Sequence, residues 1–247
     1  MSPVIGEIAV VVPSRNEAQL LPRALGALHD AMARLAEAVP DVRTTLTFVL
    51  DSTSDHSAQI LNRDPQVHVM STNTGRVGGA RNAGIAAAMA MASVEPSRLW
   101  IANTDADSAV PEDWLTCHHA FATSGAQMLL GTVEPMPGEL SGTRLAQWRN
   151  CHQLGEGHPH IHGANLGLRA DVFTKLGGFP DLAVGEDRAL VAQARAGGFH
   201  VLATDTCRVG TSARLQSRIE GGFAGFLSTL DRTGQYADPT APSSPVS

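Results

Sequence analysis

Basic residues are scarce in this chain of 247 residues. Lysine and arginine together number 18 against 24 aspartates and glutamates, so the formal net charge is −6. Surfaces that bind nucleic acid need clustered basic side chains to neutralise phosphates. We therefore expect no nucleic-acid partner.

Long apolar runs, a signal sequence and paired cysteines are also missing. No apolar run approaches the roughly 20 residues of a spanning helix, and the N-terminus lacks a basic stretch followed by an apolar one. Cys117, Cys151 and Cys207 form no Cys-x-x-Cys pair, so they are expected to be free thiols in a reducing compartment. These absences predict a soluble, cytoplasmic protein without a transmembrane segment.

Aromatic residues make up 4% of the chain, although hydrophobic residues make up 43%, so the core must be mainly aliphatic. Short β-branched runs alternate with segments of helical periodicity in the first half. This alternation predicts an α/β fold with a mainly parallel sheet flanked by helices. The expected strands are 8–12 (stopped by Pro13), 45–50, 67–70 and 99–102, and the expected helices begin near Leu21 and Ala80.

The half after residue 125 is less regular, and no linker in it marks a domain boundary. We expect strands at 127–133, 162–168 and 199–203, with helices at 140–154, 187–196 and 212–230. The polar tail 237–247 is expected to be disordered. The sequence thus predicts a single domain over residues 1–236.

Two carboxylates, Asp105 and Asp107, follow the apolar run 99–102. In an extended chain, alternate residues point to the same side. Two hard oxygen ligands on one side suit Mg²⁺ or Mn²⁺ carrying a diphosphate. The alternative is a solvated turn before the next helix.

Polar motifs also follow the second and third expected strands. Asp51-Ser-Thr-Ser-Asp55 could meet a base or a ribose hydroxyl, or cap the helix after it. The glycine-rich segment 73–84 carries Arg76 and Arg81 toward a helix N-terminus, which suits an anion, although a glycine turn with solvated arginines has the same pattern. It matches neither the Gly-x-Gly-x-x-Gly motif nor a P-loop.

The histidines of His158-Pro-His-Ile-His162 would all face one way in an extended segment. His162 could then be a further metal ligand or a diphosphate contact. The alternative is a polar loop. Trp148 fits either the core or a platform on which an acceptor stacks.

Five motifs come in the order that is seen in family-2 glycosyltransferases, and the sequence resembles that family over roughly residues 7–205. They are Pro13-Ser-Arg-Asn-Glu17, Asp51-Ser-Thr-Ser-Asp55, Asn73-x-Gly-x-x-x-x-Ala-Arg-Asn-x-Gly84, Asp105-Ala-Asp107 and Gly185-Glu-Asp187. The resemblance implies the GT-A fold, with a donor half near 7–110 and an acceptor half near 111–236. Ser52 departs from the glycine usual in the family.

The resemblance also implies roles for individual residues. Nucleotide or diphosphate contacts are implied for Pro13, Arg15, Glu17, Asp51, Arg76, Arg81 and Asp105. Asp107 resembles the metal ligand, and Glu186 with Asp187 resembles the acceptor-side pair that supplies the catalytic base. A helix cap is the alternative role for that pair.

The expected reaction is transfer of a sugar from a UDP- or GDP-sugar to an acceptor hydroxyl, with Mn²⁺ or Mg²⁺ and with inversion at the sugar; retention stays open. The acceptor would be a small molecule or lipid-linked. The Gln-x-x-Arg-Trp motif of processive synthases is absent. Two other hypotheses are a sugar-1-phosphate nucleotidyltransferase, which normally has a glycine-rich loop after its first strand, and a non-catalytic nucleotide-sugar binder.

Overall fold

A single eight-stranded sheet runs through the computed structural model, which describes residues 4–152 and 154–213. Its strand order is β3-β2-β1-β4-β7-β6-β8-β5. The strands are β1 (Glu7–Ser14), β2 (Arg43–Asp51), β3 (Val67–Thr72), β4 (Leu99–Asn103), β5 (Ser108–Ala109), β6 (Met128–Pro135), β7 (Leu166–Arg169) and β8 (Val201–Thr211). β7 is antiparallel to both β4 and β6, whereas β1, β2, β3 and β4 pair in parallel. The expected mainly parallel α/β sheet is confirmed.

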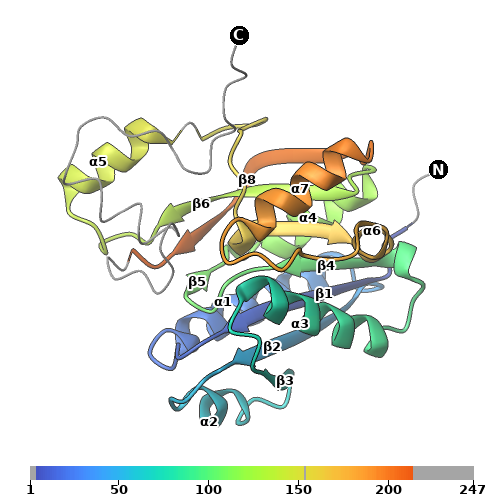
Figure 1. The fold of residues 1–247 in the computed structure, drawn as a ribbon, viewed down its shortest axis with the longest axis horizontal. Helices are drawn as coiled ribbons and strands as arrows, with labels where there is room; N and C mark the ends of the chain where they lie inside the picture. Colours follow the sequence, from blue (N-terminus) through green and yellow to red (C-terminus); the bar gives the residue numbers. More distant parts are fainter. Residues whose placement is uncertain (1–3, 153, 214–247) are drawn as a thin grey trace.

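Helices cover both faces of this sheet (Figure 1). One apolar cluster joins the sheet to α1 (Leu21–Ala38), α2 (Ser57–Leu61) and α4 (Trp114–Thr123). The other joins it to α3 (Val77–Met91), α6 (Ala170–Leu176) and α7 (Glu186–Ala196). The helix α5 (Gly142–Cys151) lies beyond the end of the sheet (Figure 1). Short 3₁₀ turns occupy Pro96–Arg98 and Gly163–Asn165.

The helix α3 approaches the sheet closely at Gly84. A Cβ atom there would lie 2.6 Å from methyl groups of both Val11 and Val49, so a side chain would push the helix away from β1 and β2. This close packing brings the N-terminal turns of α3 over the carboxyl ends of β1 and β4.

The sequence suggested that Pro13 ends the first strand, and this prediction is wrong. β1 continues to Ser14, and Pro13 pairs with Val49 of β2. The carbonyl of Val11 accepts a bond from Thr104, so the backbone of Pro13, two residues later, faces the same side, where β4 has already ended at Asn103. A proline can sit there because no partner strand needs its N–H group.

Most of the remaining predicted elements were found with shifted ends. The strand that was expected at 162–168 begins only at Leu166, because Gly163–Asn165 form a 3₁₀ turn. The helix expected at 140–154 spans Gly142–Cys151. From residue 214 onward the predicted helix 212–230 lies outside the described residues, as does the predicted disordered tail 237–247. The single domain over 1–236 therefore stays a prediction.

Candidate active site

The predicted site residues gather at one edge of the sheet. β1 and β2 run in parallel to Ser14 and Asp51, β4 ends at Asn103, and β1 lies between β2 and β4. In open α/β sheets, ligands bind outside the carboxyl ends of the strands, at the point where the strand order reverses. The loops after β1, β2, β3 and β4 meet at this edge.

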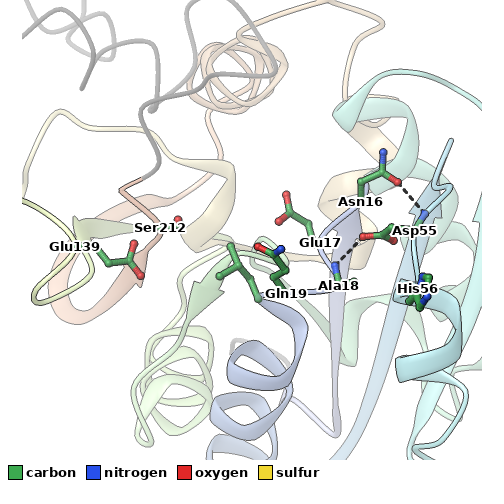
Figure 2. Close-up of a pocket in the computed structure, with 9 residues that line it drawn as sticks. Asn16, Glu17, Ala18, Gln19, Asp55, His56, Glu139 and Ser212 are labelled. Carbon is green, nitrogen blue, oxygen red and sulfur yellow. Dashed lines mark hydrogen bonds between the residues drawn. The ribbon is translucent and has the colours of Figure 1, made fainter.

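The loop after β1 is tied to the loop after β2. Asn16 adopts a left-handed φ of 54°, and its Oδ1 accepts bonds from the amides of Ser54 (2.8 Å) and Asp55 (3.3 Å). Asp55 in turn accepts a bond from the amide of Ala18 at 2.9 Å (Figure 2). Asp55 also accepts from the amide of Ser57, the first residue of α2, at 3.0 Å, although the N-cap residue of that helix is His56.

An open cavity of about 610 Å³ lies beside this loop (Figure 2). The carboxylates of Glu17, Asp55 and Glu139 are among the side chains that line it. Arg15 is exposed close by in the chain, and Pro13 is buried in β1. The cavity is acidic, so it is suited to hydroxyl or amine groups better than to a bare phosphate.

Asp51 ends β2 and is 5% exposed. Its Oδ1 accepts bonds from the Thr72 hydroxyl (2.9 Å), from the amide and hydroxyl of Thr74 (2.7 and 2.9 Å) and from the amide of Gly75 (3.3 Å). Its Oδ2 has no hydrogen-bond partner among the described residues. One oxygen therefore fixes the carboxylate while the other is available to a ligand.

The backbone at Ser52 shows why glycine is usual in the family at this position. It adopts a left-handed φ of 51°, and its amide donates to the carbonyl of Thr72 at 2.9 Å. Glycine adopts this conformation without steric strain, whereas other residues pay about 1–2 kcal/mol. The position therefore favours glycine for a reason that the backbone makes visible.

Asp105 and Asp107 follow β4 in a turn. The prediction that they alternate along an extended chain is wrong, because the amide of Ser108 bonds to the carbonyl of Asp105 at 3.0 Å and closes a turn. The Asp105 side chain is 34% exposed and Oδ1 contacts Arg81, which leaves Oδ2 without a partner among the described residues. Nowhere in residues 4–152 and 154–213 do three acidic, histidine or cysteine side chains form a metal-binding cluster.

One side chain and one backbone amide that the sequence did not indicate hold the Asp107 turn in place. Arg23, on the first turn of α1, donates to the Asp107 carbonyl at 3.2 Å and pairs with Glu139 at 2.6 Å. The amide of Ser212, past the end of β8, donates to the same carbonyl at 3.1 Å. Glu139 also accepts from the amide of Ala213, and although burial opposes it, the bond from Arg23 lowers the pKa of Glu139.

The two predicted arginines have different surroundings. The Arg76 side chain is 42% exposed and pairs at 3.0 Å with Asp181, which is itself 84% exposed. Arg81 was expected to approach the nucleotide or its diphosphate, but its side chain is only 3% exposed. Its Nη2 contacts Asp105 at 2.7 Å, and its Nη1 contacts Glu186 at 2.8 Å.

Glu186 and Asp187 open α7 behind Gly185, one residue earlier than the predicted helix start, and only one of them is accessible. The Glu186 side chain is 6% exposed, and burial raises its pKa although the Arg81 charge opposes the shift. Asp187 is half-buried, with Oδ2 accepting from the amide of Gly163 at 3.0 Å and Oδ1 from the amide of Arg188 at 2.7 Å. Of the pair, Asp187 is the carboxylate that a substrate can reach.

The three histidines of the 158–162 segment do lie in series. His160 stacks between His158 and His162, with ring centroids 5.7 and 6.0 Å apart, and His152 of the neighbouring segment stacks on His160 at 5.2 Å. Trp148 is fully buried against His152, so it belongs to the core and cannot be an acceptor platform.

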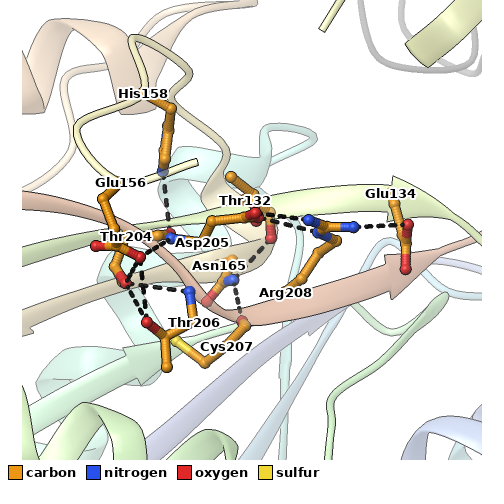
Figure 3. A network of polar contacts seen from close by, with 10 residues as sticks. All are labelled: Thr132, Glu134, Glu156, His158, Asn165, Thr204, Asp205, Thr206, Cys207 and Arg208. Carbon is orange, nitrogen blue, oxygen red and sulfur yellow. Dashed lines mark hydrogen bonds and ion pairs between the residues drawn. The ribbon is translucent and has the colours of Figure 1, made fainter. Parts of the chain in front are cut away.

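His158 has a structural role. Its Nε2 lies 3.1 Å from the carbonyl of Thr204 in β8 (Figure 3) and 3.2 Å from that of Leu130 in β6. Burial lowers the pKa of His158. Just beyond Thr204, β8 bulges away from β6. Asn165 fills the gap by donating to the carbonyls of Thr132 and Cys207, both at 2.8 Å (Figure 3). This fixes the segment that leads to Gly163.

Residues 9–177 match the family model described as glycosyl transferase family 2. The match spans more than half of the chain. The chain belongs to this family. A search of curated proteins gives no match.

Solved structures of other glycosyltransferases superpose on this chain and support the GT-A fold. Residues 1–349 of TarS from S. aureus, in complex with UDP-GlcNAc, superpose with a TM-score of 0.67 at 15% identity over 88% of this chain and 61% of that one. The mannosyltransferase PcManGT from Pyrobaculum calidifontis, in complex with GDP-Man and Mn²⁺, gives 0.56 at 19% identity over 81% and 56%. The chain spans about three fifths of the length of these structures. Among its described helices, none has both the length and the apolar character needed to cross a bilayer.

Proposed function

We propose that this family-2 chain transfers a sugar from a nucleoside diphosphate sugar to an acceptor hydroxyl, with inversion at the sugar. The observation that carries the proposal is that one arginine contacts both a donor-side and an acceptor-side carboxylate. Asp105, after β4, and Glu186, at the start of α7, each lie within 2.8 Å of Arg81. The next residue, Asp187, accepts from the amide of Gly163, whose backbone lies against the same arginine.

The nucleotide would lie across the ends of β1, β2 and β4. The partner-free Oδ2 of Asp51 would accept from a base or ribose, and Pro13, Arg15 and Glu17 would border the nucleotide from β1. Arg76 is exposed and so can turn to the diphosphate. The complexes of TarS with UDP-GlcNAc and of PcManGT with GDP-Man make uridine and guanosine donors the first to test.

Asp105 and Asp107 fit a divalent ion that the donor carries. Mg²⁺ and Mn²⁺ sites of this kind need only one or two protein carboxylates, with phosphates and water completing the shell. The free Oδ2 of Asp105 and the clamped turn of Asp107 meet that need. When bound, the ion would neutralise charge on the departing diphosphate. His162 stays a predicted further ligand, although it forms no three-residue metal cluster with these acids among the described residues.

Asp187 would take the proton from the acceptor hydroxyl as that oxygen attacks the anomeric carbon. Its two backbone bonds orient the carboxylate without neutralising it. General-base assistance of this kind contributes ~10²–10⁴-fold to the rate. The acceptor itself would be a small molecule or a lipid-linked one.

The first experiment screens UDP- and GDP-sugars with Mn²⁺ for thermal stabilisation and for release of the nucleoside diphosphate, with water as the acceptor. A donor at 100 times its Kd stabilises the fold by ~2.7 kcal/mol. For a chain of this size, that corresponds to roughly 5–10 °C in Tm. Proton NMR of the sugar released, recorded before mutarotation, reports inversion or retention.

The variant Asp187→Asn tests the base. Its amide oxygen can still accept from Gly163 but cannot take a proton, so we expect turnover to fall at least 100-fold at unchanged donor Kd. Glu186→Gln removes the neighbouring charge and keeps the Asp187 carboxylate, so its turnover should fall by no more than about tenfold. Near wild-type turnover by Asp187→Asn would show that the base lies elsewhere.

The same assays separate the two rival functions. A sugar-1-phosphate nucleotidyltransferase would release pyrophosphate from a nucleoside triphosphate. A non-catalytic binder would be stabilised by a donor without releasing nucleoside diphosphate.

A further inference from the structure

Arg81 is the most completely enclosed cation at the candidate site. Its side chain is 3% exposed, each of its two Nη atoms contacts a different carboxylate, and its guanidinium carbon lies 5.6 Å from the ring centroid of Phe179. Burial would lower the pKa of Arg81, but the charges of Asp105 and Glu186 outweigh it and raise that pKa. The side chain therefore stays charged, with both arms of its fork occupied.

The space around Arg81 is shaped by glycine. A Cβ atom on Gly163 would lie 2.4 Å from both Nη atoms of Arg81, and one on Gly78 would lie 3.0 Å from the Cγ of Glu186. Only a residue without a side chain lets the backbone at 163 lie against the guanidinium. The amide of that same Gly163 donates to Asp187 at 3.0 Å.

Arg81 thus touches three separate elements at once. It contacts the turn after β4 through Asp105, the start of α7 through Glu186, and the backbone that orients Asp187 through Gly163. A lysine has one compact ammonium group and cannot reproduce this fork, in which two separate arms meet two carboxylates.

We propose that Arg81 is a positioning residue that sets the placement of the acceptor-side base relative to the donor, and that it does not bind the donor diphosphate. A phosphate would have to displace a carboxylate from either Nη atom and enter a site that is closed to solvent. Arg76, at the N-terminus of the same helix and 42% exposed, is the arginine that can turn to the diphosphate. This inference rests on the proposed function.

The test compares Arg81→Lys with the matched control Arg76→Lys in the full chain. Calorimetry with UDP or GDP and Mn²⁺ gives the affinity for the leaving group without turnover. Release of nucleoside diphosphate at saturating donor gives kcat. Displacement of reacting groups by about 1 Å costs on the order of 100-fold in rate.

For Arg81→Lys we expect kcat to fall about 100-fold while the nucleoside diphosphate Kd stays within about threefold of wild type. For Arg76→Lys we expect the nucleoside diphosphate Kd to rise about tenfold, which is the loss of affinity that Arg81→Lys should not show. A merely structural role for Arg81 would lower Tm without separating kcat from Kd.

Two results would overturn the inference about Arg81 and leave the proposed function standing. One is an Arg81→Lys variant that loses nucleotide affinity as much as Arg76→Lys does, and the other is an unchanged kcat. If Arg81→Lys does not fold, Glu186→Gln replaces it, because it keeps an acceptor oxygen for Nη1 while removing the charge. For Glu186→Gln we then expect kcat to fall about tenfold while the nucleoside diphosphate Kd stays unchanged. A kcat equal to that of wild type would refute the positioning role of Arg81. A wild-type chain that releases no nucleoside diphosphate from any donor would overturn the proposed function itself.

Discussion

Acidification should destabilise this protein through His118, a fully buried residue of α4. Its Nδ1 accepts a bond from the indole N–H of Trp100 at 3.0 Å, so the neutral ring carries its hydrogen on Nε2. Protonation would place a second N–H against the indole N–H. Burial lowers the pKa of His118 from 6.5 to about 4, although contact with Asn165 acts in the opposite direction.

The sign and size of the effect follow from linkage between protonation and folding. Between pH 6.5 and 4 the unfolded chain binds a proton at His118 that the folded chain does not, so stability falls as the pH falls through this window. Each unit of pKa difference corresponds to about 1.4 kcal/mol, which gives about 3 kcal/mol between neutral pH and pH 4. Below pH 4 both states are protonated and the contribution stays constant.

Urea unfolding at pH 7, 6, 5 and 4 measures this contribution when wild type is compared with His118→Asn. The asparagine oxygen can accept from Trp100, and the cavity left behind should cost about 1–3 kcal/mol at pH 7. The variant should lose less stability than wild type on acidification, so that the difference between their free energies of unfolding shifts by about 3 kcal/mol in favour of the variant between pH 7 and pH 4. His68→Asn, at an exposed position of β3, is the control and should follow wild type. Parallel curves for wild type and His118→Asn would refute the reasoning.

Three further predictions concern the donor edge. Asp107→Ala should abolish the Mn²⁺-dependent part of nucleoside diphosphate binding in calorimetry, and an affinity insensitive to chelator in the wild type would contradict a metal role. Asp51→Ala should weaken nucleoside and nucleoside diphosphate alike, because Asp51 ends a different strand from the metal acids; weakening of the diphosphate form alone would contradict base or ribose recognition. Ser52→Gly should raise the free energy of unfolding by about 1 kcal/mol in urea titration, since it removes a left-handed φ from a serine. A destabilised Ser52→Gly variant would show that its side chain contributes more than the strain costs.

Much of the fold could be predicted from the sequence, because apolar periodicity reports which faces are buried. The runs 8–12, 45–50, 67–70 and 99–102 all lie within strands β1 to β4. The acids that follow β2 and β4 were found for the same reason, since a carboxylate after a buried run must lie at the end of a strand. The family motifs then supplied roles for residues such as Asp187 that periodicity could not.

Tertiary structure alone decided which of these residues a ligand can reach. Arg76 and Arg81 are indistinguishable as charges in a glycine-rich segment, and Glu186 and Asp187 are adjacent acids. The close approach of α3 to the sheet at Gly84 and the bare backbone at Gly163 bury Arg81 between two carboxylates, while Arg76 stays exposed. Exposure and pairing depend on contacts between residues far apart in the chain, such as Arg81 and Glu186, which are 105 positions apart. Such contacts leave no periodic trace in the chain, because they arise only when the helices pack on the sheet.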